Sequence, residues 1–222
     1  MTSISAYSSP PAKSTSQHDY ILLDRSSSMA DKWWETLQAI EAYVSTTRSE
    51  NVRSHITLSS FSCPFGGTIN SYVERNQPIA DWTRLESVSP PEGMTPLYDA
   101  IQQMGIHLRD LDPPRASILI VTDGEENGSR FTTLDQAKAI LDWCRTKGWQ
   151  VTFIGADFSN AKQGSLLGAD KGSAIGVQKR LMSDAARSLG KKRARYGLYG
   201  EPMHFSDTEA QQFGGYLNAP SK

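Results

Sequence analysis

Three short apolar runs constrain the fold of this chain more than any other feature of its sequence. They cover residues 20–24 (YILLD), 117–123 (SILIVTD) and 149–157 (WQVTFIGAD). Their apolar residues are nearly continuous, which is typical of strands covered on both faces. Helically spaced segments separate them at residues 31–48, 96–110 and 132–147. Alternating strands and helices predict an α/β, doubly wound fold, in which helices cover both faces of a mostly parallel central sheet.

A second group of strands is predicted at the edge of this sheet. Residues 55–61 have strand composition, and residues 63–75, with a turn at Gly66 and Gly67, fit an antiparallel partner. We therefore expect one antiparallel strand at the edge.

Thr95 and Pro96 carry the start signals of the predicted helix over residues 96–110, as its N-cap and first helical residue.

The two ends of the chain differ from this pattern. Beyond residue 157 it weakens to a helix over 177–189, a basic loop over 190–195 and a short helix from Ser206. The expected organisation is a flexible Ser/Pro-rich arm (1–17), a main domain (18–157) and a C-terminal extension packed on that domain (158–222).

Composition excludes several classes of protein. The net charge is -1, and the hydrophobic content of 38% suffices for a core. The N-terminus lacks the features of a signal peptide, and no segment approaches the ~18 apolar residues of a membrane helix. Cys63 and Cys144 are too few for a disulfide framework, and we expect both to be buried as small hydrophobes. These features predict a cytoplasmic protein with no membrane partner.

Oxygen-bearing side chains follow the predicted strands where those strands end. Asp24, Ser26 and Ser28 come directly after the first run, Asp123 ends the second, and Thr95 lies in the loop GMTPLYDA. In an open parallel sheet, ligands bind in the crevice at the carboxyl ends of the strands. Two carboxylates and three hydroxyls suit a hard divalent cation, Mg²⁺ first and Mn²⁺ second.

The segments ILLDRSSSM, GMTPLYDAI and ILIVTDGEEN resemble, in order and spacing, the three motifs of a von Willebrand factor A (vWA) domain. Those motifs build the metal-ion-dependent adhesion site (MIDAS), and the resemblance covers residues 18–157. It implies that Ser26, Ser28 and Thr95 ligate the metal directly, and that Asp24 and Asp123 do so directly or through water. A partner's Asp or Glu would complete the coordination.

This resemblance has one departure and implies particular partners. The family usually has glycine where this chain has Ser27, at a cost of about 1 kcal/mol if that position needs a positive φ. The C-terminal part resembles small prokaryotic and phage vWA proteins. That likeness implies a MoxR-type AAA+ ATPase as partner or, for a phage protein associated with the virion, a virion or host protein.

Residues close to the metal motifs are candidates for the surface that a partner touches. The expected rim consists of Arg25, Met29, Trp34, Met94 and Glu125. Asp99 lies one helical turn after Thr95, and two interpretations of it remain open: a residue that supports the ligands, or a surface residue of its helix.

A basic patch is predicted in the C-terminal part, where seven basic residues accompany one acid, Asp184. Its members are Lys179, Arg180, Arg187, Lys191, Lys192, Arg193 and Arg195. They form either a solvated helix face with a basic loop, or a contact for an acidic protein surface or nucleic acid backbone. No aromatic residues are interleaved for base stacking, so we do not expect a nucleic acid partner.

Three functional hypotheses follow. The first is a metal-dependent protein interaction module without enzymatic activity. The second is a structural or assembly component, of a virion for instance, that uses the fold without metal. The third is a Mg²⁺-dependent phosphotransferase of the haloacid dehalogenase type. That chemistry needs a second carboxylate two residues after Asp24, where this chain has Ser26.

Overall fold

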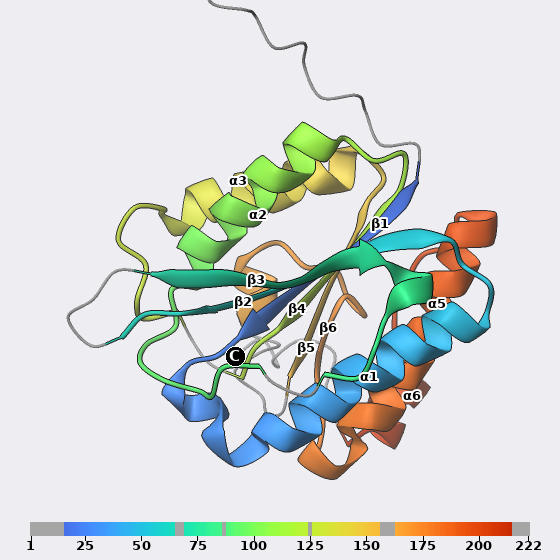
Figure 1. The fold of residues 1–222 in the computed structure, drawn as a ribbon, viewed down its shortest axis with the longest axis horizontal. Helices are drawn as coiled ribbons and strands as arrows, with labels where there is room; N and C mark the ends of the chain where they lie inside the picture. The colour runs from blue at the N-terminus through green and yellow to red at the C-terminus, as the bar shows by residue number, and fades with distance from the viewer. Residues whose placement is uncertain (1–15, 65–68, 86–87, 124–125, 156–162, 215–222) are drawn as a thin grey trace, which may run out of the picture.

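A sheet of six strands, in the order β3-β2-β1-β4-β5-β6, forms the centre of the molecule (Figure 1). The computed structural model describes residues 16–64, 69–85, 88–123, 126–155 and 163–214. The strands are β1 (Gln17–Asp24), β2 (Ser54–Ser62), β3 (Asn70–Pro78), β4 (Ala116–Val121), β5 (Gln150–Gly155) and β6 (Ala174–Gly176). Only β3 is antiparallel to its neighbour. The predicted fold class, with its antiparallel edge strand, is confirmed.

Helices cover both faces of the sheet (Figure 1). On one face lie α1 (Trp33–Ser49), α5 (Met182–Tyr199) and α6 (Asp207–Gln212), and on the other lie α2 (Leu97–Leu111) and α3 (Leu134–Thr146). The described residues also contain three short 3-10 helices: η1 (Ser27–Lys32), η2 (Ile79–Asp81) and η3 (Lys179–Leu181).

The alternation of side chains along β1 divides the core into two layers. Ile21 and Leu23 belong to the apolar cluster beneath α1 and α5, whereas Tyr20 and Leu22 belong to the cluster beneath α2 and α3. All four are buried. Successive side chains of a strand point to opposite faces, so a strand covered on both sides must be apolar throughout. This explains the continuous run YILLD.

Several element boundaries differ from the predicted ones. The helix α2 begins at Leu97 with Pro96 as its N-cap, so Thr95 is not the capping residue. The strand β3 continues to Pro78, and the predicted turn residues Gly66 and Gly67 lie outside the described residues. The predicted basic loop over 190–195 is wrong, because these residues are in α5.

The segment after residue 157 is more than an extension packed on a finished domain. The strand β6 pairs with β5 in the same sheet, and α5 packs directly on α1. A Cβ atom on Gly190 of α5 would lie 2.9 Å from the Tyr43 carbonyl oxygen and from Thr46 Cβ of α1. This close approach requires glycine, and it makes α5 part of the main core.

Cys63 and Cys144 are both buried, as predicted, and burial raises the pKa of the Cys144 thiol to about 12. Within the described ranges, no helix combines the length and the apolar character needed to cross a membrane.

Candidate metal centre

The turn that follows β1 brings the first predicted ligands together. Asp24 is fully buried at the end of the strand, where its Oδ1 accepts a hydrogen bond from the Ser26 backbone N–H (2.8 Å) and its Oδ2 accepts one from the Thr122 hydroxyl (2.6 Å). Non-glycine residues with positive φ in the described part of the chain are Asn51 and Asp112. Ser27 therefore has an ordinary backbone conformation, and the strain considered for it does not arise.

Three oxygens of this site are spaced as ligands of one ion would be. The hydroxyls of Ser26 and Ser28 are hydrogen-bonded to each other at 3.0 Å, and the Ser28 hydroxyl donates to Asp123 Oδ1 at 2.8 Å. On an octahedral Mg²⁺, with ligands at ~2.1 Å, neighbouring oxygens lie about 3 Å apart. The hydroxyl and carboxylate oxygens therefore fit a small divalent cation in both chemistry and spacing.

The loop that carries Thr95 is held against both other loops. The backbone N–H of Ser27 donates to the Gly93 carbonyl (3.0 Å), and the Thr95 backbone N–H donates to Asn127 Oδ1 (2.8 Å). Gly93 has φ +70°, and a Cβ there would lie 2.1 Å from the Cys63 carbonyl oxygen. Thr95 itself is buried between these contacts. The structure thus brings the loops of all five predicted ligands together.

Asp99 supports this loop arrangement from the start of α2. Its carboxylate is buried and accepts hydrogen bonds from the backbone N–H groups of Arg130 (2.8 Å), Phe131 (3.1 Å) and Thr132 (2.7 Å). Of the two interpretations left open, the surface residue is wrong. Asp99 anchors the segment that follows β4. The sequence alone gave no indication that three backbone N–H groups of this segment would donate to it.

The electrostatics of the site favour a bound cation. The pKa of Asp24 is raised to about 6, mainly by burial and to a smaller extent by the charge of Asp123, while the hydrogen bonds from Thr122 and Ser26 oppose the increase. A cation close to both carboxylates would oppose the effect of burial, because it stabilises their charged forms. Within the described residues no group of three His, Cys, Asp or Glu side chains is placed to hold a metal. A metal here therefore depends on the hydroxyl oxygens.

Lys32 is a member of the site that was not predicted. It is the last residue of η1, and its Nζ lies 2.5 Å from Asp123 Oδ2 and 3.5 Å from Asp31 Oδ1. The sequence held a signal for it, because Lys32 follows Ser28 by four residues, the spacing that places two side chains on one face of a helical turn.

The expected rim is only partly at the surface. Arg25 and Met29 are buried, so neither can form a contact surface. Arg25 donates from Nη1 to the Pro90 carbonyl, and Met29 packs in the core. Trp34 is 60% exposed, and Met94 is half-buried. Glu125 lies outside the described residues.

An aromatic residue that was not predicted, Phe131, lies in the segment anchored by Asp99 and is 72% exposed. Trp34 is the second residue of α1, after the turn that follows β1, and Phe131 follows β4. Both segments leave the carboxyl ends of strands that carry the site. Two exposed aromatic side chains are therefore available near the candidate metal centre.

The predicted basic patch is largely neutralised. Arg193 must be removed from it, because Arg193 is fully buried and its Nε and Nη2 lie 2.5 Å and 3.0 Å from the carboxylate oxygens of Asp19. The other basic residues are Lys179 beside Glu35, Arg187 beside Asp184, Lys192 beside Glu209, Arg195 beside Glu201, Arg180 beside Gln178, and the exposed Lys191. Four ion pairs offset most of the local positive charge.

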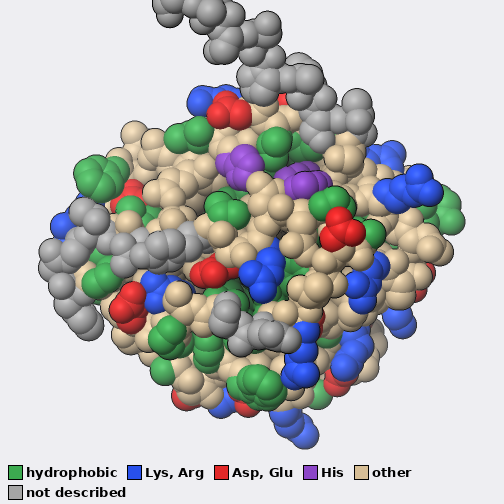
Figure 2. Space-filling model, viewed as in Figure 1, with side chains coloured by type: hydrophobic (Ala, Val, Ile, Leu, Met, Phe, Trp, Pro, Cys, Tyr) green, Lys and Arg blue, Asp and Glu red, His purple; other side chains and the backbone are tan. Residues whose placement is uncertain are grey.

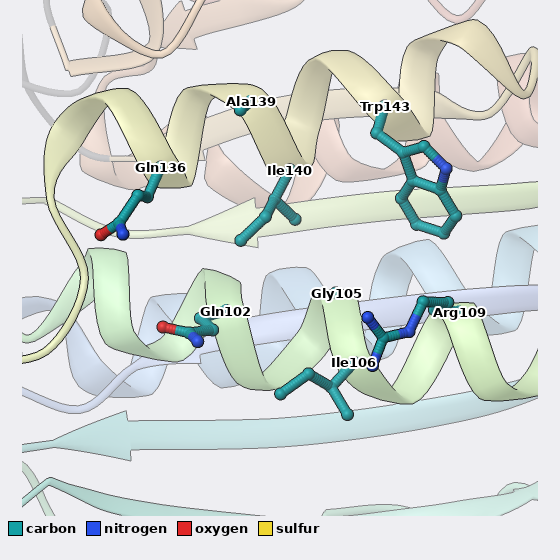
Figure 3. Close-up of a pocket in the computed structure, with 8 residues that line it drawn as sticks. All are labelled: Gln102, Gly105, Ile106, Arg109, Gln136, Ala139, Ile140 and Trp143. Carbon is teal, nitrogen blue, oxygen red and sulfur yellow. The ribbon is translucent and has the colours of Figure 1, made fainter.

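A groove of about 490 Å³ between α2 and α3 is separate from this site (Figure 3). Ile106 and Arg109 line it from α2, and Gln136, Ile140 and Trp143 line it from α3. None of its lining residues is a predicted ligand or rim residue.

No protein-family model and no curated protein sequence matches the chain. The chain is similar to the open pilus adhesin SpaC of Lactobacillus rhamnosus GG, with TM-score 0.61 and 11% identity over 82% of this chain and 30% of the adhesin. The chain is also similar to proximal thread matrix protein 1 of the mussel byssus, with TM-score 0.60 and 13% identity over 81% of this chain and 47% of that protein.

A von Willebrand factor type A structure from Catenulispora acidiphila gives TM-score 0.54 and 12% identity, over 81% of this chain and 43% of that chain. The architecture is therefore that of a vWA-like Rossmann-type fold. The chain spans less than half the length of each of these three proteins.

Proposed function

We propose that this chain is a protein interaction module that binds Mg²⁺ or Mn²⁺ and uses the ion to hold an Asp or Glu side chain of a partner. The observation that supports this proposal is the spacing of the Ser26, Ser28 and Asp123 oxygens, 3.0 Å and 2.8 Å apart, at the carboxyl end of the sheet. These are the distances between neighbouring ligands on a small octahedral cation.

Each residue has a distinct part in this proposal. Ser26, Ser28 and Thr95 would supply neutral oxygens, and Asp123 would supply a charged one. Asp24, whose two oxygens both accept hydrogen bonds from the protein, would act from behind the hydroxyls through its charge. Because neutral hydroxyls leave much of the ion's charge in place, the ion would attract a further carboxylate. That carboxylate would come from the partner.

Titration of Mg²⁺ and of Mn²⁺ into the purified chain, followed by calorimetry, tests the metal site. We expect a single ion per chain, and we expect Asp24→Ala and Asp123→Ala each to abolish binding. Asp184→Ala is the matched control, because Asp184 is an exposed acid paired with Arg187 on α5. Binding that persists in both site variants would contradict the proposed ligands.

The partner is the second part of the proposal. A MoxR-type AAA+ ATPase is the first candidate, in the cytoplasm, and a virion or host protein is the second. The fold is shared with a pilus adhesin, which fits a module that binds other proteins, although that likeness covers the fold alone. Capture of the ATPase in Mg²⁺ but not in EDTA is the expected result. Equal capture in both would contradict metal dependence.

One observation favours the alternative of a structural or assembly component that works without metal. The ammonium group of Lys32 lies 2.5 Å from Asp123 Oδ2 and already supplies a positive charge at the site. Under this alternative, assembly or partner binding survives both chelation and the Asp24→Ala substitution. Partner capture with and without EDTA, and partner capture by Asp24→Ala, therefore separate the two functions.

We favour a binding role over the phosphotransferase chemistry considered above. A nucleophilic aspartate must expose a carboxylate oxygen to its substrate. Asp24 is fully buried, and the Ser26 backbone and the Thr122 hydroxyl each donate to one of its oxygens. Hydrolysis of an aryl phosphate that is lost in Asp24→Ala but retained in Asp184→Ala would overturn this proposal.

A further inference from the structure

Lys32 is buried with the residue that it neutralises. The Lys32 side chain is 10% exposed and the Asp123 side chain 2%, and the two charged groups are 2.5 Å apart. Asp123 divides its two oxygens between Ser28, which donates to Oδ1, and Lys32, which donates to Oδ2. A carboxylate held this far from solvent needs a countercharge, and Lys32 supplies it.

An ammonium group and a divalent cation would repel each other if both stayed beside Asp123. An ion bound to the Ser26, Ser28 and Asp123 oxygens would place two further positive charges close to Lys32 Nζ. Like charges repel strongly at such separations where water is largely excluded. The carboxylate would therefore be shared between competing cations, one tethered to the chain and one free in solution.

The structure also offers the displaced ammonium another partner. Asp31, the residue before Lys32, has its Oδ1 3.5 Å from Lys32 Nζ, and its side chain is 74% exposed. A small change in the lysine side chain would move Nζ from the buried Asp123 to the solvated Asp31. Lysine suits such a move, since its single charge sits on a flexible stem.

We propose that Lys32 is an internal cation that occupies Asp123 when no metal is bound and is displaced toward Asp31 when a divalent cation enters. This inference rests on the proposed metal-binding function and adds the regulation of that site. Lys32 neutralises Asp123 in the metal-free site and lowers the affinity of the site for divalent cations. The site then fills at a higher concentration of free ion than it would without Lys32, and partner binding follows the occupancy of the site.

Calorimetric titration of Mn²⁺ into Lys32→Met is the first test, because methionine keeps an unbranched apolar side chain and removes the charge. We expect at least tenfold tighter Mn²⁺ binding than in the wild type. Lys147→Met is the matched control, since Lys147 Nζ also pairs with an aspartate, Asp112, at 3.0 Å. We expect wild-type affinity in this control. Lys32→Gln repeats the charge removal with a polar side chain in case Lys32→Met folds poorly.

A double-mutant cycle tests the route of displacement. Asp31→Asn should weaken Mn²⁺ binding several-fold in the wild type, because the displaced ammonium loses its second partner. In the Lys32→Met background the same substitution should have a much smaller effect. Equal effects in the two backgrounds would contradict the proposed movement toward Asp31, since the two residues would then act independently.

The outcomes separate this inference from the function on which it rests. Tighter Mn²⁺ binding in Lys32→Met, or binding there and none in the wild type, supports the competition. Equal or weaker binding in Lys32→Met and Lys32→Gln overturns the competition and leaves the metal site standing. Absence of binding in the wild type and in both variants, with all three folded by circular dichroism, overturns the metal site and the inference together.

Discussion

Two buried ion pairs, Asp19 with Arg193 and Asp123 with Lys32, use the same charges in different ways. Arg193 reaches Asp19 with two nitrogens, at 2.5 Å and 3.0 Å, and both side chains are completely buried. Tyr43 donates a further hydrogen bond to Asp19 at 2.9 Å. This carboxylate is saturated by groups fixed on β1's neighbouring helices, α1 and α5.

The second pair has a looser construction. Lys32 offers Asp123 a single nitrogen from a short 3-10 helix, and the Ser28 hydroxyl donates to the other carboxylate oxygen. A guanidinium fork is preorganised for a carboxylate, whereas an ammonium is a point charge on a flexible stem. The comparison teaches that burial of an ion pair does not decide its role. The type of cation and the rigidity of its element separate a structural lock from an exchangeable contact.

The largest expected effect on stability comes from breaking the ion pair between Asp19 and Arg193. Arg193→Met leaves the Asp19 charge buried without its cation, and we expect a loss of about 3–5 kcal/mol in the free energy of unfolding. Urea unfolding at neutral pH measures it. Arg187→Met is the matched control on the same helix, because the Arg187 side chain is 56% exposed. A change within about 0.5 kcal/mol is expected there. Similar losses in both variants would contradict the structural role of Arg193.

The next effect is the pH dependence of stability that arises from His18, which precedes Asp19 in β1. His18 is buried, its Nε2 lies 3.0 Å from the Thr57 hydroxyl, and burial lowers its pKa from 6.5 to about 4. Asp19 opposes this shift, whereas His55, His107 and Arg193 add to it. Histidine side chains gather on the upper part of the face shown in Figure 2.

A histidine with a lowered pKa contributes stability above its unfolded pKa, and this contribution is lost as pH falls through its folded pKa. Acidification from pH 7 to 4 should therefore remove about 3 kcal/mol of stability through His18. His18→Gln should lack this loss, as urea unfolding at both pH values would show. An exposed-site control, His204→Gln, should keep it. An unchanged pH profile in His18→Gln would contradict the assignment.

The contribution of Asp24, in the candidate metal centre, to the free energy of unfolding should change with pH in the opposite direction. Burial raises the pKa of Asp24 to about 6, above the ordinary value of 3.8. A raised carboxyl pKa stabilises the folded chain at low pH, and the contribution is lost as pH rises through about 6. In EDTA, Asp24→Asn should remove the gain of about 2–3 kcal/mol that Asp24 contributes on acidification from pH 7 to 4, so the variant should lose more stability than the wild type over this range. The same dependence in wild type and variant would contradict it.

The sequence predicted one of the two ion-pair regions far better than the other. Asp24, Ser26, Ser28, Thr95 and Asp123 follow strand ends, so topology alone brings their loops together. Arg193 and Asp19 are 174 positions apart. Their pairing depends on the packing of α5 against α1, which no local pattern encodes. Arg193 therefore resembled its solvated neighbours in a run of basic residues.

Exposure was equally hard to predict at the rim. Arg25 and Met29 lie among the predicted ligands Asp24, Ser26 and Ser28 along the turn after β1. They were expected beside the metal, but Arg25 before the 3-10 helix η1 and Met29 within it are both buried, each at most 2% exposed. Sequence proximity to a ligand is therefore a poor guide to exposure in a tight turn.

A smaller effect is expected from the support of the metal centre. Asp99→Ala removes the acceptor of three backbone hydrogen bonds in the segment after β4, and we expect a loss of about 1–2 kcal/mol in urea unfolding. Mn²⁺ affinity should fall as well, because this segment packs against the Thr95 loop. Asp110→Ala, on the same helix and 62% exposed, should leave both unchanged. Unaltered Mn²⁺ affinity in Asp99→Ala would show that the ligands are held without this anchor.

The smallest effect on stability is expected at Trp34, which belongs to neither ion pair. Its side chain is 60% exposed, so Trp34→Ala should change the free energy of unfolding by about 0.5 kcal/mol or less and leave Mn²⁺ affinity unaltered. A partner that docks on the metal would cover this side chain, and buried aromatic residues carry much of the energy of protein interfaces. Capture of the partner in Mg²⁺ should therefore fall at least tenfold. Val73→Ala is the control, since Val73 is 56% exposed on the edge strand β3. Equal capture by wild type and Trp34→Ala would remove Trp34 from the contact surface, while a loss of stability would place it with the structural residues.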